Sequence, residues 1–141
     1  MTASLPALLA SHKLGVLAVL APDGRPHLSN INYAWFPDEG PQGTLRVSLT
    51  DTRVKVRHLR RDPRVTLHVR SEDGWHWVAA EGDADLTPVA AAPDDATVEE
   101  LIDLYRRING EHPDWDDYRA AMVRDRRLVL RIRVTRLYGQ P

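Results

Sequence analysis

Short runs in which every second residue is apolar constrain the fold of this chain more than any other feature. The segment RVTLHVR at 64–70 places Val65, Leu67 and Val69 in one register and polar residues in the other. Successive side chains of a β-strand point to opposite faces of the sheet, so this pattern predicts a strand with one buried face. The segments TLRVSLT and LVLRIRVTRLY follow the same pattern.

Turn signals separate these runs and predict short connections between strands. Pro22, Asp23 and Gly24 divide two apolar runs, and Asp-Gly is a strong hairpin signal. The prolines and glycines of PDEGPQG at 37–43 predict a second turn. Gly82 predicts a bulge or a close backbone approach within its strand. The sequence predicts six strands, at 14–20, 27–36, 44–50, 64–70, 75–87 and 128–138.

Helical patterns lie before and between these strands. Thr50, Asp51 and Thr52 are good N-cap residues for one of them. A chain of 141 residues suits one domain, here 1–141, and short strands joined by turns favour a small antiparallel barrel because closure removes exposed edges. The sequence predicts helices at 4–13, at 53–61, after a capping-box pattern formed by Thr97 and Glu100, and after Pro113.

Composition excludes several kinds of function. The formal net charge is -1, so no global field attracts nucleic acid or anionic lipid, and we expect no nucleic-acid partner. The chain has no cysteine, which excludes disulfides, thiolate metal sites and thiol nucleophiles, and its histidines lack metal-ligand spacing. The longest apolar run near the start, 14–21, has 8 residues against the roughly 20 that span a membrane. We therefore expect no membrane span and a cytoplasmic protein.

A local block of positive charge stands out against this balance. A helix start has free backbone N–H groups and the positive end of the helix dipole, so Arg53 and Lys55 beside it would form a site for a phosphate or carboxylate. A solvated helix face whose charges pair with Asp and Glu explains the same block, and the residues alone leave both interpretations open. The basic residues of this block are Arg53, Lys55, Arg57, Arg60, Arg61 and Arg64.

Two further segments are candidates for contact with a ligand. Trp75 and Trp77 predict two indoles on one face of a strand, where they would either flank a planar ring or form a core or dimer contact. Ser29, Asn30 and Asn32 offer hydrogen bonds to a polar ligand. The chain has no nucleophile elbow, phosphate loop or dinucleotide fingerprint. If it is an enzyme, we expect a cofactor to carry the chemistry.

The order of the motifs resembles that of a known superfamily. The segments are GVLAVLAPDGRPHLSN at 15–30, VSLT at 47–50, RVKVRHLRRDPRV at 53–65 and EDGWHWVAAEGDADLT at 72–87. Together they resemble the split β-barrel flavin/deazaflavin oxidoreductases, the pyridoxamine 5'-phosphate oxidase-like superfamily, and more narrowly its actinobacterial branch that uses coenzyme F420. The likeness continues through AAAPDD, GEHPDWDDYR and MVRDRR, so it covers almost the whole chain.

The resemblance implies a six-stranded antiparallel split β-barrel, FMN-binding-protein-like, that forms a homodimer with two cofactor sites at the subunit interface. It implies that the cofactor phosphate is held by Arg53, Lys55 and Arg57, helped by Ser48 and Leu49. It implies that the deazaflavin ring is lined by Ser29, Asn30, Ile31, Asn32 and Tyr33. The contacts implied from the partner subunit are those of Trp75, His76 and Trp77. Arg127 would reach the phosphate or the glutamyl tail.

The activity that the resemblance implies is that of an F420H2-dependent reductase. A hydride would move from C5 of the reduced deazaflavin to an unsaturated organic small molecule, and the protein would supply orientation and an electrostatic clamp. Two alternatives belong beside it: an FMN-binding enzyme of the pyridoxamine 5'-phosphate oxidase type, and a non-catalytic protein that binds F420, flavin or haem. The sequence identifies no catalytic residue and no proton donor.

Overall fold

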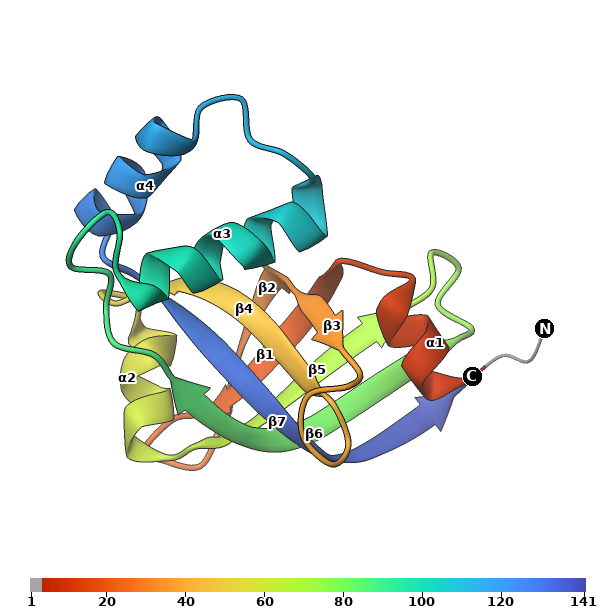
Figure 1. Cartoon of the computed structure of the whole chain (residues 1–141). Coiled ribbons are helices and arrows are strands. Elements are labelled where there is room, and N and C mark those ends of the chain that lie inside the picture. Colours follow the sequence, from red (N-terminus) through yellow and green to blue (C-terminus); the bar gives the residue numbers. More distant parts are fainter. Residues whose placement is uncertain (1–3) are drawn as a thin grey trace.

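The computed structural model describes residues 4–141, which form one curled antiparallel sheet with helices around it (Figure 1). The strands are β1 (Leu14–Leu20), β2 (Pro26–Asn32), β3 (Ala34–Phe36), β4 (Thr44–Thr50), β5 (Arg64–Arg70), β6 (Trp77–Leu86) and β7 (Arg127–Gln140). The helices are α1 (Leu5–Ala10), α2 (Val54–Arg61), α3 (Ala96–Asn109) and α4 (Trp115–Arg124). The predicted fold class, mainly β with added helices, is confirmed.

The sheet has the strand order β2-β1-β5-β6-β7-β4-β3, and this order explains its barrel-like curl. Its two edge strands, β2 and β3, are consecutive in the chain and are joined by the single residue Tyr33. The chain therefore bridges the two edges covalently, while no ladder of hydrogen bonds joins β2 to β4 within the described sheet. The barrel is split at this seam.

The prediction of one continuous strand at 27–36 is wrong, and the described part of the chain has seven strands rather than six. The first half pairs with β1, as in Ile31 with Gly15, and the second half pairs with β4. Tyr33 lies at the change of partner: its backbone N–H bonds to the Lys13 carbonyl (2.8 Å), opposite it in the β1–β2 register, and its buried hydroxyl donates to the Leu9 carbonyl (2.7 Å). These two bonds tie the strand change to the segment that precedes β1.

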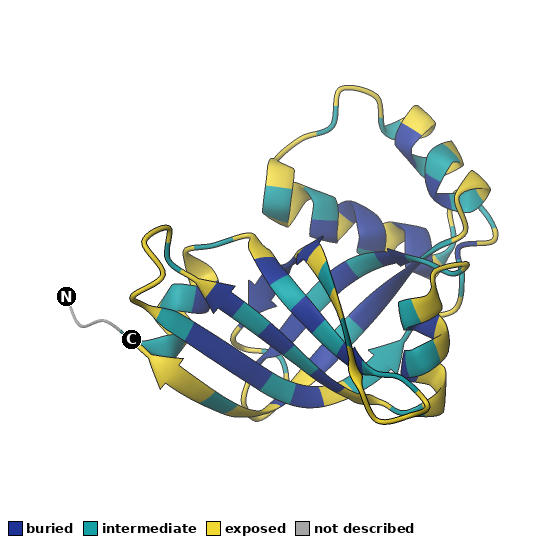
Figure 2. Cartoon of the chain, turned by 180° about the vertical axis from the view of Figure 1, so that it is seen from behind, coloured by how far each residue is buried: buried dark blue, intermediate teal, exposed yellow. Residues whose placement is uncertain are grey.

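The predicted alternation of buried and exposed positions along the strands is confirmed. Figure 2 shows buried positions alternating with more exposed ones along the ribbons. The inward residues of β1, β4, β5 and β7 form one apolar core, in which Leu17, Leu45, Leu67 and Leu130 have no exposed surface. A second apolar cluster attaches the two late helices to β7 and includes Leu101, Ile102, Tyr118, Met122 and Val129.

Gly82 lies at a β-bulge, as the sequence predicted. The register between β6 and β7 shifts between Glu81 and Gly82. A Cβ at position 82 would overlap the backbone carbonyl of Arg133 on β7, so only glycine lets the two strands approach this closely. The bulge bends β6, which helps the sheet to curl.

The predicted N-caps differ from the observed ones. The capping-box prediction for α3 is wrong: Asp95 caps this helix and accepts a hydrogen bond from the Val98 N–H (2.9 Å), while Thr97 donates instead to the Pro88 carbonyl (2.9 Å). Helix α2 begins at Val54 after Arg53, and no side chain caps it. No helix among residues 4–141 has the length and apolar character needed to cross a membrane.

Candidate functional site

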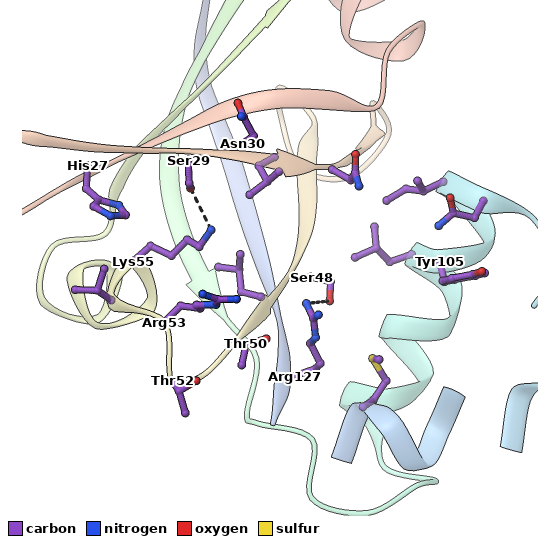
Figure 3. A pocket seen from close by; sticks show the side chains of 18 of the residues that line it. His27, Ser29, Asn30, Ser48, Thr50, Thr52, Arg53, Lys55, Tyr105 and Arg127 are labelled. Atoms are coloured by element: carbon purple, nitrogen blue, oxygen red, sulfur yellow. Dashed lines mark hydrogen bonds between the residues drawn. The ribbon is translucent and has the colours of Figure 1, made fainter. Parts of the chain in front are cut away.

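The candidate site is a cavity of about 960 Å³ at the seam between β2 and β4 (Figure 3). Strand β3 covers only the Thr44 to Arg46 part of β4, so the rest of that edge and the outer edge of β2 have no strand partner. Unpaired strand edges present backbone N–H and C=O groups. The cavity is lined by His27, Leu28, Ser29, Asn30, Ile31, Asn32, Ser48, Leu49, Thr50, Thr52, Arg53, Val54, Lys55, Leu104, Tyr105, Ile108, Asn109, Tyr118, Met122 and Arg127.

Most of the site residues that the resemblance implied lie together around this cavity. Those that line it are Ser29, Asn30, Ile31, Asn32, Ser48, Leu49, Arg53, Lys55 and Arg127. The others are outside its lining in this chain: Tyr33, Arg57, Trp75, His76 and Trp77. Tyr33 is buried in the core, and Arg57 is exposed on α2. The role of each residue toward a cofactor stays a prediction.

Lys55 reaches the cavity because α2 packs Val56 and Leu59 into the core and leaves Lys55 half-buried beside them. Its ammonium donates a hydrogen bond to the Ser29 hydroxyl on β2 (3.1 Å), across the seam (Figure 3). Burial lowers the pKa of Lys55 below its ordinary value, and repulsion from Arg53 and Arg127 lowers it further. An anion at this position would attract the ammonium and so oppose both effects.

Arg53, Lys55 and Arg127 form a group of cations, named here the cation cluster, that has no carboxylate partner among residues 4–141. Arg127 makes one long contact, from Nη1 to the Ser48 hydroxyl (3.4 Å), and its buried Nε has no hydrogen-bond partner. Partly buried, unpaired donors of this kind are costly until an acceptor binds. The cation cluster is therefore suited to a phosphate or carboxylate group.

Three other arginines of the basic block have protein partners, whereas Arg57 is exposed and makes no ion pair among residues 4–141. Arg60 pairs with Asp51 (2.7 Å) and Arg64 pairs with Asp62 (2.7 Å). Arg61 donates to the Leu20 carbonyl (2.6 Å). Both interpretations of the block thus apply to different residues, since one part forms surface ion pairs and the other faces the cavity.

The far side of the cavity is apolar and comes from the late helices. Leu104, Tyr105 and Ile108 of α3 and Tyr118 and Met122 of α4 form this apolar wall. Figure 3 shows Tyr105 on α3 and Lys55 on α2 with Arg127 and Ser48 between them. Sequence reasoning missed this wall because the same residues predict only the packing face of two helices. It also missed His27, whose buried Nδ1 has no hydrogen-bond partner.

The prediction that Trp75 and Trp77 open a strand with both indoles on one face is wrong. Trp75 and His76 belong to the turn before β6, where the backbone N–H groups of Trp75 and His76 bond to Asp73 and Ser71. Trp75 is 76% exposed, whereas Trp77 stacks on His68 with ring centroids 5.5 Å apart. The side chains of Ser71 and Asp73 accept hydrogen bonds from these backbone N–H groups, which are therefore not available for a β-ladder.

A curled antiparallel sheet that is split at one seam, with a cavity at the split, is the architecture of the split β-barrel class. The family model of pyridoxamine 5'-phosphate oxidase matches residues 1–140. The chain belongs to this family, and the resemblance of its sequence to the pyridoxamine 5'-phosphate oxidase-like superfamily is confirmed.

Solved structures share the fold across nearly the whole chain. An F420 reductase is 24% identical, with coverage of 98% of each chain and a TM-score of 0.69. The conserved hypothetical protein Rv2991 from Mycobacterium tuberculosis is 24% identical, with coverage of 99% of this chain and 86% of that one and a TM-score of 0.73. The haem storage protein HutZ from Vibrio cholerae is 15% identical, with coverage of 94% and 89% and a TM-score of 0.68. The structures similar to this chain therefore include both enzymes and binding proteins.

Proposed function

We propose that this chain is an F420H2-dependent reductase that transfers a hydride to an unsaturated organic small molecule. The observation that carries the proposal is the cation cluster, which lines a cavity of about 960 Å³ and has no carboxylate partner among residues 4–141; Lys55 and Arg127 are half-buried and Arg53 is exposed. The likeness to an F420 reductase over 98% of both chains supports it. The reduced deazaflavin would supply the hydride, since the chain offers no catalytic motif of its own.

The residues of the cavity suit the two chemical parts of such a ligand. Arg53, Lys55 and Arg127 would hold a phosphate, and Arg127 fits this role because its buried Nε lacks an acceptor. Asn30 and Asn32 are exposed along β2 and would donate to polar ring atoms. The apolar wall would exclude water and contact the acceptor. Arg57, which is exposed outside the cavity, has no place in this arrangement within one chain.

Binding of purified protein to F420 and to FMN, titrated separately at one salt concentration, tests this proposal. We expect saturable F420 binding, followed by oxidation of F420H2 with a suitable acceptor. FMN is the second candidate because the matching family model is that of an FMN-type oxidase and a phosphate clamp would serve it equally. Tight FMN binding without F420 binding would contradict the F420 proposal. F420 binding without turnover across a broad acceptor panel would favour a storage role.

We also propose that the chain acts as a homodimer whose partner completes the cofactor site. Leu28 is 61% exposed next to the cavity, and its register partners Ala18 and Thr66 continue the same outward face across β1 and β5. Leu28 is the exposed apolar residue of this row, Ala18 and Thr66 are half-buried, and exposed apolar surface on a sheet face is typical of an interaction surface. A second copy on this face would bring its own side chains to the mouth of the cavity.

Ala18→Arg should convert the dimer to a monomer and weaken F420 binding, because the new guanidinium stands on the outward face without lining the cavity. Sedimentation velocity measures the mass of the assembly, and fluorescence titration measures its affinity for F420. Gln42→Arg, in the exposed turn before β4, adds the same charge and should change neither. A wild-type monomer with full F420 affinity would refute the interface proposal.

A further inference from the structure

The carboxylate of Asp51 lies between the elements that carry the cation cluster. Asp51 follows the last residue of β4, and its side chain is 16% exposed. One carboxylate oxygen pairs with Arg60 on α2 (2.7 Å), and the other accepts a hydrogen bond from Arg126 (3.0 Å). Asp51 therefore connects the end of β4, helix α2 and the turn that leads into β7.

The backbone of Asp51 strengthens this connection. Its N–H donates to the carbonyl of Arg126 (3.0 Å), so Arg126 is bound through both its main chain and its side chain. Arg126 has φ 53, in the left-handed region that non-glycine residues seldom adopt. A strained residue of this kind persists only where its surroundings fix it. The residue that follows it is Arg127, which enters the cavity.

The cations near Asp51 fall into two groups, those that pair with Asp51 and those that line the cavity. Neither Asp51 nor its partners Arg60 and Arg126 line the cavity. Hydrogen bonds from Arg126 and Arg60 hold the pKa of the Asp51 carboxyl below its ordinary value, so it is charged at neutral pH. Asp51 thus pairs with the two outer arginines and forms no ion pair with Arg53, Lys55 or Arg127.

We propose that Asp51 is a positioning residue for the cation cluster. Its side chain does not line the cavity, but it links the last turn of α2, through Arg60, to the turn before β7, through Arg126. These two elements carry the three cations, so Asp51 sets the spacing at which they meet a phosphate. The proposal rests on the anion-binding function inferred above.

Charge alone makes the opposite prediction, which allows a decisive test. Removing a carboxylate near an anion site makes the region more positive and should strengthen anion binding if Asp51 acts only as a charge. Removing a positioning residue should weaken binding, because the cations lose their common geometry. The sign of the change therefore separates the two roles.

The test compares Asp51→Asn with Asp62→Asn, each titrated with inorganic phosphate and with F420 at one salt concentration. Asp62 is a matched control because its side chain is equally exposed, at 16%, and pairs with Arg64 away from the cavity. We expect Asp51→Asn to weaken the binding of both ligands by about tenfold. Removing a residue that orients a metal ligand weakens metal binding by a comparable factor. Asp62→Asn should bind as wild type or slightly tighter.

Asp51→Glu is a second variant for the case in which Asp51→Asn does not fold. It keeps the negative charge and moves the carboxylate by one methylene. It should also weaken binding, and a wild-type affinity in folded Asp51→Glu would overturn the proposal. Equal or tighter binding by folded Asp51→Asn would overturn it as well. If the wild-type protein binds neither phosphate, F420 nor FMN, the proposed function itself fails, and this inference fails with it.

Discussion

Replacing Lys55 with alanine should weaken F420 binding by about 1.5–3 kcal/mol, or roughly 10- to 150-fold, the range of a hydrogen bond to a charged group. Lys55 is half-buried in the cavity, bonds to Ser29 across the seam and has no carboxylate partner among the described residues. A bound phosphate would be its counter-ion, so truncation removes an interaction that no neighbouring acid replaces. Equilibrium titration at fixed salt measures the change.

Arg57→Ala is the matched control for this experiment. It removes one positive charge from the same helix, but Arg57 is exposed and does not line the cavity. We expect a change well below that of Lys55→Ala, because exposed charges separated from a ligand are screened by salt. An unchanged dissociation constant for Lys55→Ala would contradict the assignment of Lys55. An equally large loss for Arg57→Ala would show that Arg57 reaches the ligand in the assembled protein.

Leu67→Ala should lower the free energy of unfolding by about 2–5 kcal/mol, the cost of emptying a fully buried leucine site. Leu67 has no exposed surface and lies opposite Leu17 of β1 and Ala80 of β6, in the middle of the core. Domains are stable by only about 5–15 kcal/mol, so this is a large fraction of the total. Chemical denaturation monitored by tryptophan fluorescence measures it.

Leu14→Ala makes the same chemical change at a position that is 60% exposed at the start of β1. We expect a change within about 0.5 kcal/mol, as for most surface substitutions. Similar losses for the two variants would mean that Leu67 does not lie in the core. A loss of F420 affinity in folded Leu67→Ala would indicate that core packing also shapes the seam.

The strands could be predicted from the sequence because their signal is local. Alternation in 64–70 and 44–50 depends only on neighbouring residues, and burial follows it in the structure. The break at Tyr33 could not be predicted, because it depends on which strands the two halves of 27–36 pair with, β1 and β4, and not on neighbouring residues. The cap of α3 was missed for a different reason: two acceptable capping signals overlap, and the carboxylate of Asp95 takes the helix N–H.

Part of the candidate site could also be predicted from the sequence, because some of its residues are neighbours in the chain. Arg53 and Lys55 lie two residues apart at the start of one helix, so their proximity is a local fact. Arg57 is two residues beyond Lys55, which places it about 200° around the helix, and it is exposed to solvent. Arg127 was connected to this group only by resemblance to a family, because nothing local relates it to α2.

The sequence by itself determined the alternating strands, the turns between them, the bulge at Gly82 and a basic helix of undecided purpose. Only the tertiary structure decided which cations lack a carboxylate partner. Arg60 forms an ion pair with Asp51 and Arg64 forms one with Asp62, whereas the cation cluster lines the cavity. It also decided that α3 and α4 provide the apolar wall. The physical reason is that a strand pattern reports which face is buried, whereas a site depends on which distant side chains the curled sheet brings to one seam.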